Sequence, residues 1–258
     1  MALLSVRELT VRFGGLRAVD GFSMDVTAGR IHSLIGPNGA GKTSVINAIT
    51  GLYPAAGSIR LDGRELLGRA PHAIAELGVT RTFQNVELFA DMSVLDNVLV
   101  GAHRRLRYGV LAGTLQAGPR WRREGQERRR AEEILETVGL ADERAREAGD
   151  LTFGKQRRLE LARALATGPR LLLLDEPAAG MTAAEIGGLN TILLALRARE
   201  ALTILLVDHV MQVVMEISDT ITVLHYGRKI AEGSAERVRT DPEVVRAYLG
   251  EGRRRARA

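Results

Sequence analysis

Short apolar runs alternate with amphipathic stretches along most of the chain. Three runs are predicted as strands: residues 31–35, 171–174 and 203–207. The run at 171–174 is continuously apolar, as in a central parallel strand. Four stretches are predicted as helices: residues 42–49, 155–166, 183–197 and 210–217. Because strand and helix alternate, the pattern predicts a mostly parallel sheet with helices on both of its faces.

Two other parts of the chain show different patterns. Residues 4–11 and 22–26 mix apolar and polar positions as half-buried strands do, and residues 58–63 indicate a further short strand with a turn. Residues 93–100 begin like a capped helix, and a charged helix is predicted over residues 124–138. We interpret this second part as a helical insertion in an α/β domain.

Composition places the chain among soluble globular proteins. It has 258 residues, of which 45% are apolar, and it contains no cysteine, so disulfides and thiolate-bound metals are excluded. No apolar run approaches the ~20 residues of a membrane-spanning helix, and the N-terminus lacks a signal-peptide pattern. We therefore expect a soluble, cytoplasmic protein.

The chain is basic, with a net charge of +5. Much of the excess is concentrated in residues 104–130 and in the Arg-rich tail after residue 252. Such clusters are most simply a solvated face and a frayed terminus. Binding to nucleic acid or to an anionic membrane surface is an alternative that composition leaves open.

Residues 31–44 carry the strongest chemical signal in the sequence. The pattern G-x-x-x-x-G-K-[ST] lies there between a predicted strand and a predicted helix, as Gly36-Pro37-Asn38-Gly39-Ala40-Gly41-Lys42-Thr43, followed by Ser44. The glycines allow the backbone to curl with its N–H groups facing a phosphate at the positive end of the helix. Lys42 adds charge on the β and γ oxygens, and Thr43 offers a hydroxyl ligand to Mg²⁺. We therefore predict that the chain binds a nucleoside triphosphate.

Two adjacent carboxylates, Asp175 and Glu176, follow the apolar run at residues 171–174. Ligand sites of parallel sheets lie beyond the carboxyl ends of the strands, so both acids should lie near the phosphate loop. Asp175 is predicted to hold Mg²⁺, directly or through water, and Glu176 to act as general base on an attacking water. An ordinary acidic turn is the alternative, and the upstream phosphate loop argues against it.

Two single residues carry little information by themselves. His209 follows the predicted strand at residues 203–207, with Asp208 as the expected N-cap of the next helix. Gln84 lies just before the helical insertion. In isolation each is more simply a structural residue, and both gain weight only from their order relative to the other motifs.

The segment Leu151-Thr152-Phe153-Gly154-Lys155, here called the signature segment, opens another predicted helix. Because a helix N-terminus binds anions, Thr152 and Gly154 would form a second phosphate-binding end. Two such ends in one chain suggest a dimer in which each subunit covers the nucleotide of the other.

With these motifs in this order, almost the whole chain resembles the ATP-binding subunits of ABC transporters. The phosphate loop, Gln84, the signature segment, the two acids and His209 carry the resemblance. Several stretches are most similar to the ATPase subunits of branched-chain amino acid importers: residues 80–89, 94–101, 154–163, 175–181 and 246–251.

The resemblance implies a fold and its boundaries. We expect an α/β P-loop NTPase (RecA-like) core with a small antiparallel β subdomain and an inserted α-helical subdomain. A single ABC ATPase domain would cover residues 1–258, with the core and β subdomain in 1–90 and 156–250. The helical subdomain and signature segment would occupy 91–155, and a basic tail 251–258.

The resemblance also implies what the site residues do. ATP and Mg²⁺ would be bound by the phosphate loop, with Lys42 taking part in catalysis and Phe13 stacking on adenine. A buried core position is the alternative for Phe13. Gln84 would touch the metal and sense the membrane subunit. Thr152 and Gly154 would contact the γ-phosphate bound to the opposite subunit, and His209 would orient that phosphate and the water.

The implied assembly lies at the cytoplasmic face of the cell membrane as a peripheral complex. Its members would be two multi-span permeases, this chain and a second ABC ATPase that is either another copy or a paralogue. A periplasmic or extracellular binding protein would take part indirectly, and no nucleic acid is expected.

Two positions depart from the family pattern. The usual Leu-Ser-Gly-Gly-Gln is replaced by the signature segment, which keeps a hydroxyl and a glycine, so we expect a working site to which Lys155 adds positive charge. Thr182 stands where the family usually has Asp, and Thr182-Ala-Ala-Glu185 is itself a capping box that predicts the start of a helix. Communication between the two ATP sites through this loop is therefore in question.

Taken together, the sequence predicts an ATPase subunit that powers import of branched-chain or other hydrophobic amino acids. The ATPase of a lipid or lipopolysaccharide exporter is an alternative with the same fold. A soluble ABC ATPase acting on ribosomes or DNA is an alternative of another class, but such proteins usually carry two cassettes or a long coiled-coil insertion.

Overall fold

A computed structural model describes residues 1–82, 87–103, 117–200 and 202–255. The chain divides into two compact units. Unit 1 comprises Met1–Arg81, Arg170–Gly180 and Leu193–Ala258, and unit 2 comprises Thr82–Pro169 and Met181–Ile192. Within the described ranges, no helix is both long enough and apolar enough to cross a membrane.

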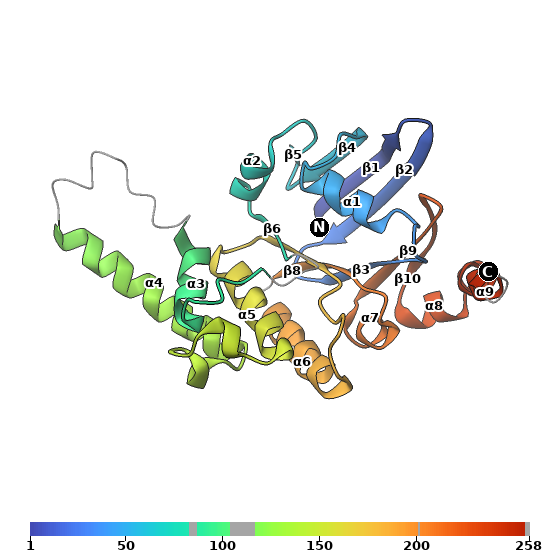
Figure 1. Cartoon of the computed structure of the whole chain (residues 1–258). Coiled ribbons are helices and arrows are strands. Elements are labelled where there is room, and N and C mark those ends of the chain that lie inside the picture. Colours follow the sequence, from blue (N-terminus) through green and yellow to red (C-terminus); the bar gives the residue numbers. More distant parts are fainter. Residues whose placement is uncertain (83–86, 104–116, 201, 256–258) are drawn as a thin grey trace. The chain divides into compact units, whose positions relative to one another are not determined.

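One sheet of unit 1 is antiparallel and is built largely from the N-terminal hairpin (Figure 1). In the described residues it has four strands in the order β2-β1-β4-β5: β1 (Ala2–Phe13), β2 (Leu16–Thr27), β4 (Ala56–Leu61) and β5 (Arg64–Glu65). Alternate side chains such as Leu4, Val6 and Phe22 are fully buried, as the mixed apolar and polar pattern predicts. The predicted half-buried strands are therefore confirmed.

The second sheet of unit 1 is parallel except at one edge. In the described residues its six strands have the order β10-β9-β3-β8-β7-β6. They are β3 (Ile31–Ile35), β6 (Val79–Arg81), β7 (Leu171–Asp175), β8 (Thr203–Val207), β9 (Thr220–His225) and β10 (Arg228–Gly233), with β10 antiparallel to β9. Every residue of β3, β7 and β8 is buried, which explains the continuous apolar run in β7, while β3 also buries the polar residues His32 and Ser33.

This register places the chemistry-bearing loops at one edge of the sheet. β3 and β7 both pair with β8 in parallel, with Ser33 opposite Leu206 and Asp175 opposite Val207. The segments that follow β3, β7 and β8 therefore leave the sheet at the same edge, as expected for a ligand site of an α/β protein.

Unit 1 also contains several helices (Figure 1). They are α1 (Lys42–Ile49), α2 (Pro71–Glu76), α7 (Met211–Ile217), α8 (Ala235–Thr240) and α9 (Pro242–Arg255). The predicted helix over residues 42–49 is confirmed at both ends. The prediction of Asp208 as the N-cap of α7 is wrong. The N-cap residue is Val210, and its side chain makes no capping hydrogen bond.

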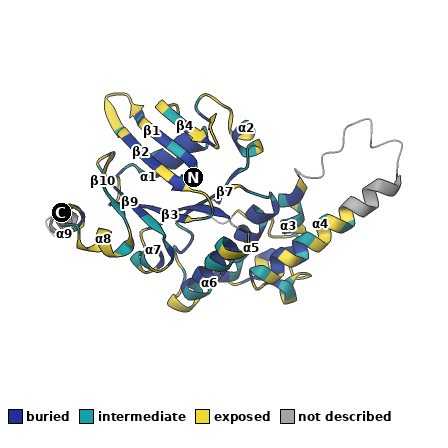
Figure 2. Cartoon of the chain, turned by 180° about the vertical axis from the view of Figure 1, so that it is seen from behind, coloured by how far each residue is buried: buried dark blue, intermediate teal, exposed yellow. Residues whose placement is uncertain are grey.

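Unit 2 is helical in its described residues. Its elements are α3 (Val94–Ala102), α4 (Ala117–Thr137), α5 (Phe153–Ala166), the first part of α6 (Ala183–Glu200), and the 3₁₀ turns η2 (Ala141–Glu143) and η3 (Ala148–Asp150). α3 packs against α4 and α5. Figure 2 shows exposed residues along much of α4, whereas α5 is largely buried, with Leu159 and Ala162 at its core. The Ser93 hydroxyl caps α3 by accepting from the Asp96 N–H at 3.0 Å, so the predicted cap is confirmed.

Candidate functional site

The loop between β3 and α1 can be built only with glycine at two of its positions. Gly36 has φ +154° and Gly41 has φ +107°, conformations that residues with a Cβ rarely adopt. A side chain at position 36 would also collide with the Leu224 carbonyl of β9, and one at position 41 with the Ala18 carbonyl of β2. The loop is therefore held in its curled form by backbone packed against it from two strands.

Lys42 begins α1 with its ammonium turned back onto this loop. Its Nζ donates to the Gly36 carbonyl at 2.6 Å and to the Pro37 carbonyl at 3.1 Å, and the residue is buried. Thr43 is exposed, and no acidic residue occurs in the first turn of α1. An anion at this helix end would meet N–H groups and a lysine without a competing carboxylate on the helix itself.

Asp175, the last residue of β7, is tied to its surroundings by an arginine that the sequence analysis did not single out. Arg81 ends β6, and its Nη2 donates to Asp175 Oδ2 at 2.6 Å while its Nη1 donates to Asn47 Oδ1 of α1 at 2.6 Å. The Arg81 and Asp175 side chains are only 12% and 7% exposed, so this is a buried ion pair. The guanidinium thus fixes the carboxylate relative to the helix that follows the phosphate loop.

Glu176 and His209 lie together beyond the ends of β7 and β8. Glu176 has φ +50°, an uncommon value for a residue other than glycine, and its N–H donates to the Val207 carbonyl at 2.7 Å. Its Oε1 lies 3.6 Å from Nδ1 of His209. The His209 side chain is 54% exposed and that of Glu176 is 22% exposed, so both can reach a ligand. Backbone strain of this kind is commonly stored at functional sites.

Asp208 joins the two loops that carry these residues. Its fully buried carboxylate accepts from the Val210 N–H at 2.8 Å and from the Ala178 N–H at 3.2 Å. Burial raises the pKa of Asp208, partly offset by these two backbone bonds. The expected N-cap role is therefore wrong: the side chain is a buried brace between the loop after Glu176 and the loop of His209.

In unit 2, the signature segment begins α5 with Thr152 as its exposed N-cap residue. Gly154 is buried, and a side chain there would collide with the carboxylate of Glu185. Lys155 forms an ion pair with Glu143, so its charge is already partnered in this structure. The Thr182–Glu185 capping box is confirmed: the Thr182 N–H donates to Glu185 Oε2 at 2.9 Å, and the Glu185 N–H donates to the Thr182 hydroxyl at 3.4 Å.

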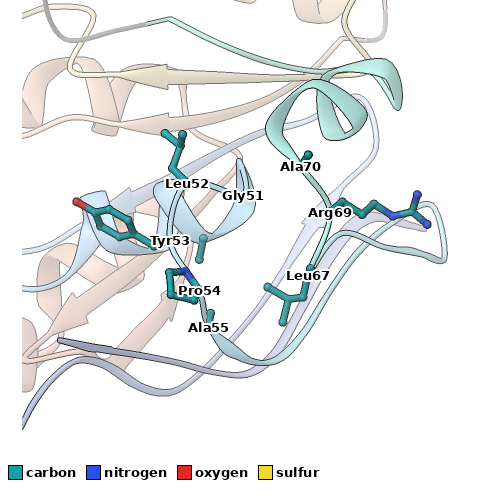
Figure 3. Close-up of a pocket in the computed structure, with 10 residues that line it drawn as sticks. Gly51, Leu52, Tyr53, Pro54, Ala55, Leu67, Arg69 and Ala70 are labelled. Atoms are coloured by element: carbon teal, nitrogen blue, oxygen red, sulfur yellow. The ribbon is translucent and has the colours of Figure 1, made fainter. Parts of the chain in front are cut away.

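Phe13, a predicted site residue, lies on the surface of unit 1. Phe13 is 44% exposed and meets Tyr53 edge-on at 5.0 Å between ring centroids, so the buried-core alternative is excluded. Gln84 lies outside the described residues. A pocket of about 510 Å³ lies where α1 ends, lined by residues 51–55 and 67–70 and Ala48 (Figure 3). It contains none of the predicted site residues, and Figure 3 shows the Arg69 head group pointing away from it.

The donor set is compatible with a nucleotide-bound magnesium ion. Among the residues that the structure describes, no group of three His, Asp or Glu residues could hold a metal alone. Mg²⁺ is usually held by one or two protein oxygens together with phosphates and water, so this finding agrees with Asp175 and Thr43 as partial ligands.

A parallel sheet with a glycine-built phosphate loop after β3 and paired acids after β7 defines a P-loop NTPase. A family model for ABC transporters matches residues 19–179, and a model for branched-chain amino acid ATP-binding cassette transporters matches residues 228–254. The chain therefore belongs to the ABC transporter family, within which it is an ATP-binding cassette and an ABC ATPase. The family predicted from the sequence is confirmed.

Relatives with known names span nearly the whole chain. The high-affinity branched-chain amino acid transport ATP-binding protein BraF of Pseudomonas aeruginosa is 47% identical, covering 96% of this chain and 98% of that protein. LivG of Escherichia coli K12, named for the same transport, is 46% identical with the same coverage. The ADP conformation of an ATP-binding cassette from an ABC transporter is 30% identical, with a TM-score of 0.84 and coverage of 97% of this chain and 99% of that one. The predicted fold class is thus confirmed.

Proposed function

We propose that this chain is the ATPase subunit of an importer for branched-chain or other hydrophobic amino acids, bound peripherally at the cytoplasmic face of the membrane. The observation that carries the cargo class is the near-full-length similarity to BraF and LivG, together with the matched C-terminal segment at residues 228–254. Two permeases, a second ABC ATPase and an external binding protein would complete the transporter.

ATP binds at the edge of the parallel sheet. Residues 36–44 surround the phosphates with backbone N–H groups and with the Lys42 ammonium, which leaves its present carbonyl partners for phosphate oxygens. The exposed Phe13 ring stacks on adenine. Thr43, Gln84 and Asp175 would hold Mg²⁺, which when bound neutralises charge on the β and γ oxygens.

Hydrolysis uses the pair beyond β7 and β8. Glu176 accepts a proton from a water whose oxygen attacks the γ-phosphorus, while the bond between that phosphorus and the β–γ bridging oxygen breaks. His209, 3.6 Å from Glu176, orients the γ-phosphate and the water. The ion pair to Arg81 keeps Asp175 in place.

Coupling to the membrane needs a second subunit and a docking surface. Thr152 and Gly154 would bind the γ-phosphate of the ATP held by the opposite ATPase, so that two ATPs close the pair. Part of the docking surface lies after Gln84, where Phe89 is 49% exposed. Its backbone is held by Asn97, which accepts from the Phe89 N–H and donates to the Phe89 carbonyl, both at 3.0 Å. Closure would pull on the permeases through this region.

The test is affinity purification of the tagged chain from detergent-solubilised membranes of its native cell, followed by mass spectrometry. Two multi-span permeases and a second ABC ATPase are expected. Phe89→Asp should lose the permeases, whereas Leu16→Asp, which places the same charge on a 67% exposed apolar residue of β2, should retain them. Exporter components would change the cargo, and ribosomal or DNA-processing partners without a membrane protein would overturn the proposal.

A further inference from the structure

A carboxylate of this chain lies against the signature segment. Glu185, in the first turn of α6, is so close to Gly154 that a Cβ at position 154 would come within 2.5 Å of its carboxyl carbon. Gly154 has no side chain of its own, and its backbone N–H is one of the groups that stabilise the charged Glu185. An anion thus already occupies the end of α5 that the proposed function reserves for a phosphate.

Glu185 is held there by the loop that follows Glu176. Its Oε2 accepts from the Thr182 N–H at 2.9 Å and from the Thr182 hydroxyl at 2.8 Å. These two bonds lower the pKa of Glu185, with smaller contributions from Arg158 and from the Gly154 N–H. The carboxylate is therefore charged at neutral pH. Thr182 stands where the family usually has Asp. Through its bonds to Glu185 it links the loop after Glu176 to the signature segment.

A positively charged side chain lies on α5 within electrostatic reach of the same carboxylate. Arg158 lies one turn after Gly154, and its charge already acts on Glu185. Its Nη2 lies 2.6 Å from where a Cβ of Gly188 would be, one turn along α6 from Glu185. Among the described residues, Arg158 Nε is buried and lacks a hydrogen-bond partner. A buried donor without an acceptor, on the same helix as Gly154, is a group that a carboxylate could satisfy.

We propose that Glu185 is a gate on the signature segment, bound to Gly154 in the free subunit and displaced towards Arg158 when the γ-phosphate of the opposite subunit arrives. The inference rests on the proposed function, in which that phosphate binds at Gly154. The carboxylate lies against Gly154 itself, and two anions at the same helix end repel each other strongly, so the phosphate must displace the carboxylate. The bonds from Thr182 carry the displacement to the loop of Glu176, which supplies the communication that the missing Asp put in question.

The test uses the full chain carrying Glu176→Gln, which traps bound ATP, together with any partner ATPase that co-purifies. ATP-driven association is followed by light scattering on a size-exclusion column over a range of ATP concentrations. Glu185→Gln keeps an acceptor for Thr182 but removes the charge, so half-maximal association should need ~5–10-fold less ATP. The matched control is Glu236→Gln, in the first turn of α8 behind the Ser234 cap, which should leave the midpoint unchanged.

A double-mutant cycle with Arg158 separates the gate from a merely structural role. Arg158→Gln removes the position that receives the carboxylate, so association should need several-fold more ATP, but only while Glu185 is present. Thermal unfolding and nucleotide binding by the isolated subunits confirm that each variant is folded. An unchanged midpoint in Glu185→Gln, or equal effects of Arg158→Gln with and without Glu185, would overturn the gate. Failure of the Glu176→Gln parent to associate with ATP would instead contradict the underlying sandwich, before Glu185 is changed.

Discussion

The helices α1 and α5 both begin where the sequence predicts phosphate binding, yet their first turns are built in opposite ways. At α1 the preceding loop is shaped by glycines pressed against backbone carbonyls, and Lys42 lies on the loop with no acid in the first turn. At α5 the backbone is ordinary, the flanking Lys155 is paired with Glu143, and the carboxylate of Glu185 lies against Gly154.

This difference indicates two kinds of anion site. The α1 site is prepared in advance, because its shape depends on backbone that cannot move without unfolding neighbouring strands. In the proposed function, the site at α5 would first have to be cleared of the Glu185 carboxylate, so its occupation would depend on a displacement of that side chain. ATP would therefore bind to the phosphate loop of one subunit without a rearrangement. Binding of its γ-phosphate by the signature segment of the second subunit would require Glu185 to move first.

Because we propose Glu176 as the general base, the largest effect is expected from Glu176→Gln. The amide cannot accept the proton of the attacking water, so turnover should fall about 10²–10⁴-fold while ATP binding persists. Steady-state phosphate release and equilibrium nucleotide binding measure the two quantities. Glu236→Gln is the control for a loss of one negative charge. Hydrolysis at the wild-type rate would mean that Glu176 is not the base.

The next largest effect should come from the ion pair that fixes Asp175. Arg81→Met leaves this buried carboxylate without its guanidinium, which should cost about 3–5 kcal/mol of unfolding free energy in urea titrations. Arg228→Met breaks the pair with Asp20, in which the arginine is 71% exposed, and should have a far smaller effect. Equal losses would show that Arg81 does not organise the prepared site.

How far the sequence predicts this molecule depends on the range of the interactions involved. Local signals succeeded: the helix at Lys42–Ile49, the strand at Thr203–Val207 and the Ser93 cap are recovered because each rests on neighbours within a few residues. The strands β9 and β10 and the helices α8 and α9 were not predicted as elements. The family resemblance supplied the overall fold.

Contacts between residues far apart in the sequence could not be predicted from it. Arg81 and Asp175 are 94 positions apart, and the residues around Arg81 show no pattern that predicts a buried ion pair. Asp is a residue type that is common at helix N-caps, so the sequence favoured that role for Asp208. In the structure its carboxylate is buried and accepts from the Ala178 N–H, so it braces the loop after Glu176 instead. Glu185 was readable as part of a capping box, but not as the partner of Gly154, because that contact joins α6 to α5.

A buried histidine of β3, the strand before the phosphate loop, should make the free energy of unfolding depend on pH. Burial lowers the pKa of His32, in β3, from 6.5 to about 4. The unfolded chain binds a proton below pH 6.5 and the folded chain does not until about pH 4, so stability is lost as pH falls through this interval. The loss should approach about 3 kcal/mol.

The measurement is urea unfolding at intervals from pH 7 to pH 4. In His32→Asn the difference from the wild type should shrink steadily as pH falls, because the substituted side chain does not titrate. His72→Asn, at an exposed position in α2, controls for the loss of a histidine as such. A difference that stays constant across the interval would exclude His32 as the titrating group.

The smallest expected change, Gly154→Ala, tests the comparison most directly when set beside Gly36→Ala. Alanine at position 36 meets the Leu224 carbonyl and a φ of +154°, so it should lose at least about 1–3 kcal/mol of stability and with it nucleotide binding. The three atoms nearest to an alanine Cβ at position 154 all belong to the flexible Glu185 side chain, in a helical turn that favours alanine over glycine by about 0.5–1 kcal/mol. Urea unfolding should therefore find Gly154→Ala within about 1 kcal/mol of the wild type. A loss as large as that of Gly36→Ala, relieved by adding Glu185→Ala, would mean that the carboxylate is a fixed brace and that the two helix ends are equally rigid.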